Sequence, residues 1–175
     1  LVAGGVDAIL FETFNDLAEM LIALKTAREA APDLPVICQM TFAQDDRTIS
    51  GHMPGAVARA LTDAGADVIG VNCSGGPAQI SRVLQQMRLV APDATLSALP
   101  NAGFPQTIGG RTMYPATVEY FADYALQFKA LGATIIGGCC GTTPDHIGAM
   151  PQLSTSLGTQ PSQSQRKLSR IARVA

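Results

Sequence analysis

The sequence contains no tryptophan, and aromatic residues make up only 5% of its 175 residues. Charged residues are also scarce, at 15%, whereas hydrophobic residues reach 47%. This balance excludes an intrinsically disordered chain, which needs high charge and few apolar residues, and it predicts one domain with a sizeable core. The net charge of −2 gives no case for nucleic-acid binding by the chain as a whole, and we expect no nucleic-acid partner.

Long hydrophobic runs are missing as well. The sequence has no stretch of 18 apolar residues and no secretory signal, so we expect no membrane partner. Four cysteines in a chain of this size do not make a disulfide framework, and we expect a reducing cytoplasm as the location. The chain begins at Leu1 rather than at Met and runs almost at once into an apolar segment. We therefore expect a fragment whose N-terminal part is missing.

Short apolar runs alternate with amphipathic patterns along the chain. The runs predict five strands, at residues 7–12, 35–42, 67–72, 95–100 and 133–138. Between the runs, apolar residues recur at the spacing of one helix face, starting at Leu17, Val57, Ile80 and Val118. Strands and helices in alternation indicate βαβ units on a parallel sheet.

Such a sheet is either open and doubly wound or closed into a (βα)₈ barrel. No Gly-x-Gly-x-x-Gly follows the first run, which disfavours a dinucleotide-binding fold. Polar or reactive residues come at the end of every predicted strand, where barrel enzymes carry their chemistry: Glu12, Gln39, Thr41, Asn72, Cys73, Asn101, Cys139 and Cys140. Since a full barrel typically needs about 250 residues, we predict an α/β fold, the C-terminal part (about five βα units) of a (βα)₈ TIM barrel.

The composition changes near residue 154. We assign residues 1–153 to the partial barrel domain. Residues 154–165 are rich in Ser, Thr, Gln, Gly and Pro, which is typical of a solvated linker. Basic side chains without any acidic one follow up to residue 175. We predict that residues 154–175 form a linker and a basic tail, which either opens a further domain or is disordered.

Three cysteines stand at predicted strand ends. Cys73 follows Gly-Val-Asn, and the pair Cys139 and Cys140 ends a run two strands further along. In a closed barrel, alternate strands direct residues toward the same region of the mouth. Thiolates are soft ligands that suit Zn²⁺, and three protein ligands leave a fourth position open. The pattern indicates either a zinc site that activates a thiol or small cysteines packed at strand ends.

The motifs around these cysteines resemble the homocysteine-binding domain of the homocysteine S-methyltransferase family. The similarity lies in Gly-Val-Asn-Cys at 70–73, Gly-Gly-Cys-Cys-Gly at 137–141, Phe-Glu-Thr-Phe at 11–14 and Pro-Asn-Ala-Gly at 100–103. It covers roughly residues 4–150. The chain is most similar to the bacterial domains joined to a methylenetetrahydrofolate reductase or to the cobalamin modules of methionine synthase.

The resemblance implies zinc-dependent transfer of a methyl group to the thiol of homocysteine, giving methionine. It implies that Cys73, Cys139 and Cys140 are the metal ligands. The methyl donor would be methylcobalamin or a methylfolate, bound largely by other domains of a longer protein. Because about three strands of the mouth are absent, we expect this fragment alone to be inactive.

Other polar residues at the strand ends are weaker candidates. Glu12 matches a family glutamate that holds the ammonium group of the substrate, although a glutamate there also suits a helix cap or a solvent-facing position. Asn72 and Asn101 are candidate donors to a metal-bound sulfur, but asparagine also suits a strand-to-loop turn. We expect Cys38 to pack in the core and His146 to lie in the first turn of the last helix, not on the metal.

Two alternative functions stay open. The first is a zinc-dependent alkyltransferase that acts on a different thiol. The second is a non-catalytic zinc-binding half-barrel module, because an open five-stranded segment has exposed edges that can recruit a partner.

Overall fold

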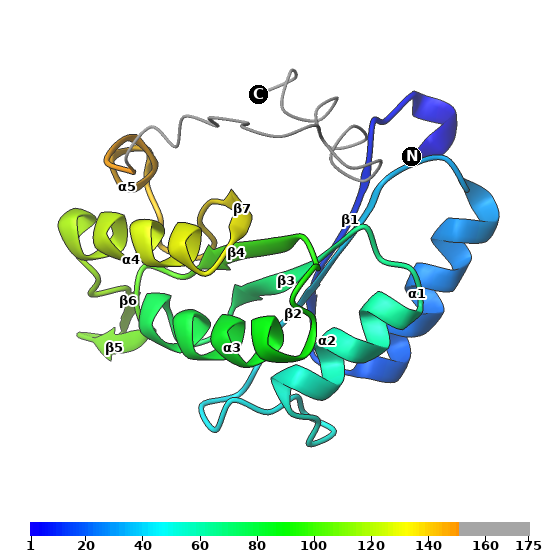
Figure 1. Ribbon diagram of the computed structural model, residues 1–175. Coiled ribbons are helices and arrows are strands. Elements are labelled where there is room, and N and C mark those ends of the chain that lie inside the picture. The colour runs from blue at the N-terminus through cyan, green and yellow to red at the C-terminus, as the bar shows by residue number, and fades with distance from the viewer. Residues whose placement is uncertain (151–175) are drawn as a thin grey trace.

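A computed structural model describes residues 1–150, in which strands and helices alternate (Figure 1). A short 3₁₀ turn at Val2–Gly4 precedes the first strand. The strands are β1 (Ile9–Phe14), β2 (Val36–Met40), β3 (Val68–Cys73), β4 (Leu96–Pro100), β5 (Gln106–Ile108), β6 (Arg111–Met113) and β7 (Ala133–Ile136). The helices are α1 (Leu17–Ala30), α2 (Pro54–Asp63), α3 (Pro77–Val90), α4 (Val118–Ala130) and α5 (Pro144–Gly148).

Five of the strands form one parallel sheet in the order β1-β2-β3-β4-β7. Figure 1 shows the four long helices, α1 to α4, along one side of this sheet. Each crossover returns to the neighbouring position in the sheet, as in a (βα)₈ barrel. The arrangement confirms the predicted α/β fold and its reading as part of a TIM barrel. Residues 154–175, for which a linker and basic tail were predicted, lie outside the described residues.

The core lies between the helices and the sheet. Alternate strand residues face the helices because side chains alternate across a strand, and they form the buried cluster that includes Cys38, Ile69, Val71 and Leu96. Cys38 is thus a core residue, as predicted. The residues between them face the other side of the sheet, which corresponds to the interior of a barrel.

The barrel-side face carries a buried polar layer. Gln39, Gly70 and Ser97 lie side by side on β2, β3 and β4. The Gln39 amide reaches across Gly70 and donates to the Ser97 hydroxyl at 3.0 Å. A Cβ atom on Gly70 would overlap with the hydroxyl and carbonyl oxygens of Ser97. The polar layer therefore depends on glycine at position 70.

The hairpin of β5 and β6 was not predicted. Its strands pair antiparallel around Gly109 and Gly110, both in the left-handed region. Two glycines between short β-prone segments are a known signal for a tight hairpin turn, so the sequence did contain it. The hairpin lies between β4 and α4, and its residues are exposed. Among residues 1–150, no helix has both the length and the apolar character needed to cross a membrane.

Arg88 holds the carboxyl ends of two helices at the opposite edge of the sheet. From the last turn of α3, its guanidinium donates to the carbonyl oxygens of Leu131 at 3.0 Å, Gly132 at 3.1 Å and Ala94 at 2.9 Å. These carbonyls have no helical partners. We expect Arg88→Met to lower the free energy of unfolding by about 2 kcal/mol, measured by urea denaturation.

Arg82→Met is the matched control for that measurement. Arg82 pairs with Asp46 at 3.0 Å, but its side chain is 54% exposed. An exposed ion pair contributes at most about 1 kcal/mol. Equal losses for the two variants would contradict the role assigned to Arg88.

Candidate metal centre

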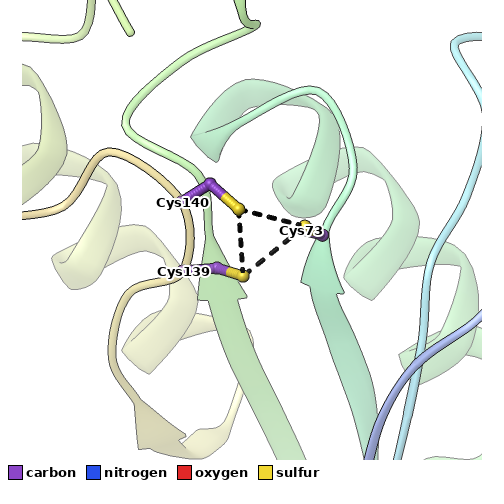
Figure 2. A group of neighbouring side chains, drawn as sticks. All are labelled: Cys73, Cys139 and Cys140. Atoms are coloured by element: carbon purple, nitrogen blue, oxygen red, sulfur yellow. Dashed lines mark hydrogen bonds between the residues drawn. The ribbon is translucent and has the colours of Figure 1, made fainter.

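Three thiols meet at the carboxyl edge of the sheet (Figure 2). Cys73 is the last residue of β3, and Cys139 and Cys140 lie in the loop after β7, on the other side of β4. The sulfur–sulfur distances are 3.5 Å for Cys73–Cys139, 3.7 Å for Cys73–Cys140 and 3.9 Å for Cys139–Cys140. The structure thus brings together the three cysteines singled out in the sequence.

The spacing of these thiols fits a tetrahedral metal ion. A Zn–S bond of about 2.3 Å with tetrahedral angles separates two sulfurs by about 3.8 Å, whereas a disulfide joins them at about 2.05 Å. All three thiols are free. Cys73 and Cys139 are half-buried and Cys140 is exposed, so one side of the centre is accessible. Three soft donors with an open side suit a zinc ion that can accept a further ligand.

The turn after β3 directs Cys73 toward the other two thiols. Cys73 and Ser74 both adopt left-handed backbone conformations, with φ of 57° and 58°, which cost energy for residues other than glycine. The Ser74 hydroxyl donates to the Asn72 carbonyl at 3.1 Å and accepts from the Phe42 amide at 3.0 Å. Local hydrogen bonds therefore hold this turn in a conformation that the chain would otherwise avoid.

The loop carrying the other two thiols is fastened to the end of β4. The Cys139 amide donates to the Pro100 carbonyl at 2.8 Å, and the Cys140 carbonyl accepts from the Ala102 amide at 2.9 Å. Gly141 follows with φ of 76°. The ring of Tyr114 covers it so closely that any Cβ there would overlap with the ring. These contacts explain the glycine after the cysteine pair.

Asn101 connects the two loops that carry the thiols. Its side chain is buried, and its amide donates to the Ser74 carbonyl at 2.9 Å while its oxygen accepts from the Cys140 amide at 3.0 Å. Asn101 thus bonds main-chain groups of the two thiol-bearing loops rather than a sulfur. A donor to sulfur is present in Asn72, whose Nδ2 lies 3.9 Å from the Sγ of Cys139.

The remaining polar candidates lie elsewhere in the structure. Glu12 is exposed on β1, two residues before that strand ends at Phe14. His146 lies in the first turn of α5, as predicted, where its ring bonds Thr143 and packs against Phe121. His52 bonds Ser50 in the loop before α2. The metal-capable group found among residues 1–150 contains neither histidine.

The electrostatics of the centre favour neutral thiols as long as no cation is bound. Burial, and then the two neighbouring thiols, raise the pKa of Cys73 to about 12. Burial is also the main cause at Cys38, whose pKa is likewise raised to about 12. Thiolates repel one another unless a cation lies between them, and a divalent ion reverses the balance by favouring deprotonated sulfur. The sulfur cluster is therefore suited to a metal ion and unsuited to charged free thiolates.

Three thiols that converge at the carboxyl edge of a barrel-type sheet make a candidate metal site on part of a (βα)₈ scaffold. The family model described as homocysteine S-methyltransferase matches residues 1–153. The chain belongs to this family, which confirms the resemblance found in its sequence motifs.

Curated relatives include two methionine synthases. Those of Mycobacterium leprae and Mycobacterium tuberculosis are each 36% identical over 152 residues, which cover 84% of this chain. The match spans only 12% and 13% of the two relatives, respectively. Among solved structures, the metallated form of the homocysteine methyltransferase MmuM from Escherichia coli aligns with a TM-score of 0.68 and 25% identity, covering 86% of this chain and 46% of that one.

Proposed function

We propose that this chain forms the thiol-activating half of a homocysteine S-methyltransferase. The reaction would transfer a methyl group to the sulfur of homocysteine and give methionine. The observation that carries the proposal is the group of three free thiols, 3.5 to 3.9 Å apart at the edge of the sheet. Family membership supports the substrate, and we propose Zn²⁺ as the ion because it suits this ligand set.

The residues of the chain have distinct proposed tasks. Cys73, Cys139 and Cys140 would hold the ion through their thiolates, and bound zinc would lower the pKa of the substrate thiol so that it is nucleophilic at neutral pH. Three thiolates around a divalent ion would give the centre a net negative charge, which would preserve the nucleophilicity of that sulfur. The substrate thiolate attacks the methyl carbon, and the donor leaves with the electron pair of the broken bond.

Substrate binding requires more than the sulfur. We propose that Glu12 binds the ammonium group of homocysteine by a charge-assisted hydrogen bond. Asn72 would donate to the Cys139 sulfur, and Asn101 would keep the two ligand-bearing loops in register. Hydrogen bonds of this kind orient metal ligands and tune the metal.

We propose that the methyl donor is bound by other domains of a longer protein. The chain spans only about an eighth of the methionine synthases that it matches, with 12% and 13% coverage. We propose that it works within a longer protein whose other domains bind methylcobalamin or a methylfolate. We expect that protein to act in the reducing cytoplasm, since the thiols must stay reduced.

Metal content and thiol selectivity test the proposal. We expect about one zinc per folded chain after purification without added metal, with the fold checked by circular dichroism. In the cobalt-substituted protein, homocysteine should shift the thiolate-to-cobalt absorption more than cysteine or 2-mercaptoethanol does. A folded chain without metal would refute the zinc centre. Equal shifts for all thiols would favour an alkyltransferase of another specificity.

Turnover separates the enzyme from a non-catalytic zinc module. The natural protein that carries these residues should convert homocysteine to methionine when supplied with methylcobalamin or methylfolate. Full metal loading with homocysteine bound but no product from either donor would favour the non-catalytic alternative.

A further inference from the structure

Strand β1 contains an irregularity beside Glu12. Phe11 pairs with Cys38, but the next pair joins Phe14 to Met40, so three steps on β1 match two on β2. Phe11 and Phe14 both pack against the core, with ring centroids 5.9 Å apart. The extra residue of this β-bulge therefore falls at positions 12 and 13. Bulges often redirect a side chain next to an active site.

Thr13 is the strained residue of this bulge. Its φ is 62°, in the left-handed region, where a β-branched residue is a genuine outlier. Such a conformation persists only when surrounding contacts enforce it. Strain at this point therefore calls for a specific partner.

The partner is the side chain of Asn72, on a strand that is not adjacent to β1 in the sheet. The Thr13 amide donates to Asn72 Oδ1 at 2.8 Å, and Asn72 Nδ2 donates to Thr13 Oγ1 at 2.7 Å. Thr41, just after β2, donates to the Asn72 carbonyl at 3.2 Å. Asn72 is fully buried, so these bonds form in a protected environment. The ends of three strands are thus joined through one residue, Asn72, by its side-chain amide and its main-chain carbonyl.

The same amide reaches the metal centre. Asn72 Nδ2 lies 3.9 Å from the Cys139 sulfur as well as 2.7 Å from Thr13 Oγ1. Glu12 directly precedes Thr13, and its position along β1 depends on how the bulge is fixed. One buried side chain therefore connects the proposed ammonium-binding strand end with a proposed metal ligand.

We propose that Thr13 is a positioning residue for amine recognition. Held by Asn72 in its left-handed conformation, it orients Glu12 at a fixed place relative to the thiol centre, so that the amine and sulfur of homocysteine are recognised together. This inference rests on the proposed function. A purely structural Thr13–Asn72 pair would instead affect all ligands of the site equally.

Two small-molecule ligands distinguish a positioning role of Thr13 from a purely structural one. Homocysteine carries the amine, whereas 4-mercaptobutanoate has the same chain without it. Their dissociation constants would be measured by absorption titration of the cobalt-loaded natural protein that carries these residues. Thr13→Val keeps the shape of the side chain and removes its hydroxyl. We expect this variant to weaken the binding of homocysteine about tenfold and the binding of 4-mercaptobutanoate less than about twofold.

Further variants complete the design. Thr13→Ser keeps the hydroxyl and should retain homocysteine affinity. Thr62 lies on the exposed face of α2, where its hydroxyl donates to the Ala58 carbonyl at 2.8 Å. Thr62→Val should leave the affinity for both ligands unchanged. Zinc affinity, measured by competition with a chelator, should stay unchanged in Thr13→Val. If that variant does not fold, Thr13→Gly removes the same hydroxyl, accepts the left-handed conformation and must show the same selectivity.

A double-mutant cycle tests whether Thr13 acts through Glu12. In a Glu12→Gln background, Thr13→Val should cause little additional loss of homocysteine affinity, because the group that it positions is already gone. Parallel losses for both thiols, additive losses in the cycle, or unchanged homocysteine affinity would each overturn the inference while leaving the proposed function intact. A metal-loaded wild-type protein that does not bind homocysteine would overturn both.

Discussion

Replacing Cys139 by alanine should remove bound zinc and abolish methyl transfer by the natural protein. The substitution leaves two sulfurs, and the ion would then lose a thiolate that has no substitute within the triad. Loss of a mere hydrogen-bond partner of a metal ligand typically costs about 10- to 100-fold. Loss of the ligand itself should therefore lower turnover by more than about a hundredfold. Zinc analysis of the folded variant and methionine formation would be measured on the same sample.

Cys38→Ala is the matched control for that experiment. Cys38 is also a free thiol, but it is completely buried between the sheet and the helices. Its loss should cost about 1 kcal/mol of packing and leave zinc content unchanged. Zinc lost from Cys38→Ala, or fully retained in Cys139→Ala, would show that the ligands are wrongly assigned.

Gly70→Ala should have the largest effect on stability among single-methyl changes in the sheet. The new Cβ would overlap with both the side chain and the backbone of Ser97 on the neighbouring strand. Backbone cannot move aside without breaking the pairing of β3 and β4. We expect the free energy of unfolding to fall by about 3 kcal/mol or more, measured by urea denaturation with circular dichroism.

Gly148→Ala provides the comparison. A Cβ at this helix position meets no atom within 4 Å, and alanine favours helix over glycine by up to about 1 kcal/mol. This variant should be neutral or slightly more stable than the wild type. If both variants lost a comparable amount of free energy of unfolding, the crowding at Ser97 would have to be relieved in solution.

The sequence was sufficient for the alternation of strands and helices and for the three cysteines. The alternation follows from local hydrophobic patterns. The cysteines follow because the carboxyl ends of parallel strands meet at one edge of the sheet, and Cys73 and the pair Cys139 and Cys140 mark two such ends. The bulge at Thr13 could not be predicted, because simple alternation along β1 assigns each residue to a face without an extra position. Its partner Asn72 lies 59 residues away, beyond any local pattern.

The position of Asn101 illustrates the same limit. The sequence suggested a donor to a sulfur, and any asparagine at a strand end can serve as one. In the structure it bonds the Ser74 carbonyl and the Cys140 amide. Which of several nearby acceptors an amide chooses depends on the conformation of two loops, and those loops are fixed by left-handed residues and glycine contacts that propensity does not reveal.

The thiols stand 66 residues apart along the chain and flank β4 in space. An ion held by them would therefore act as a reversible cross-link that closes a large loop, as a disulfide does in a secreted protein, and lower the entropy of the unfolded chain. It would fasten β7, which has only one neighbour in the described sheet, to β3 across the strand between them. Metal supply would then govern both chemistry and the persistence of the fold, because an ion that binds only the folded chain shifts the folding equilibrium toward it.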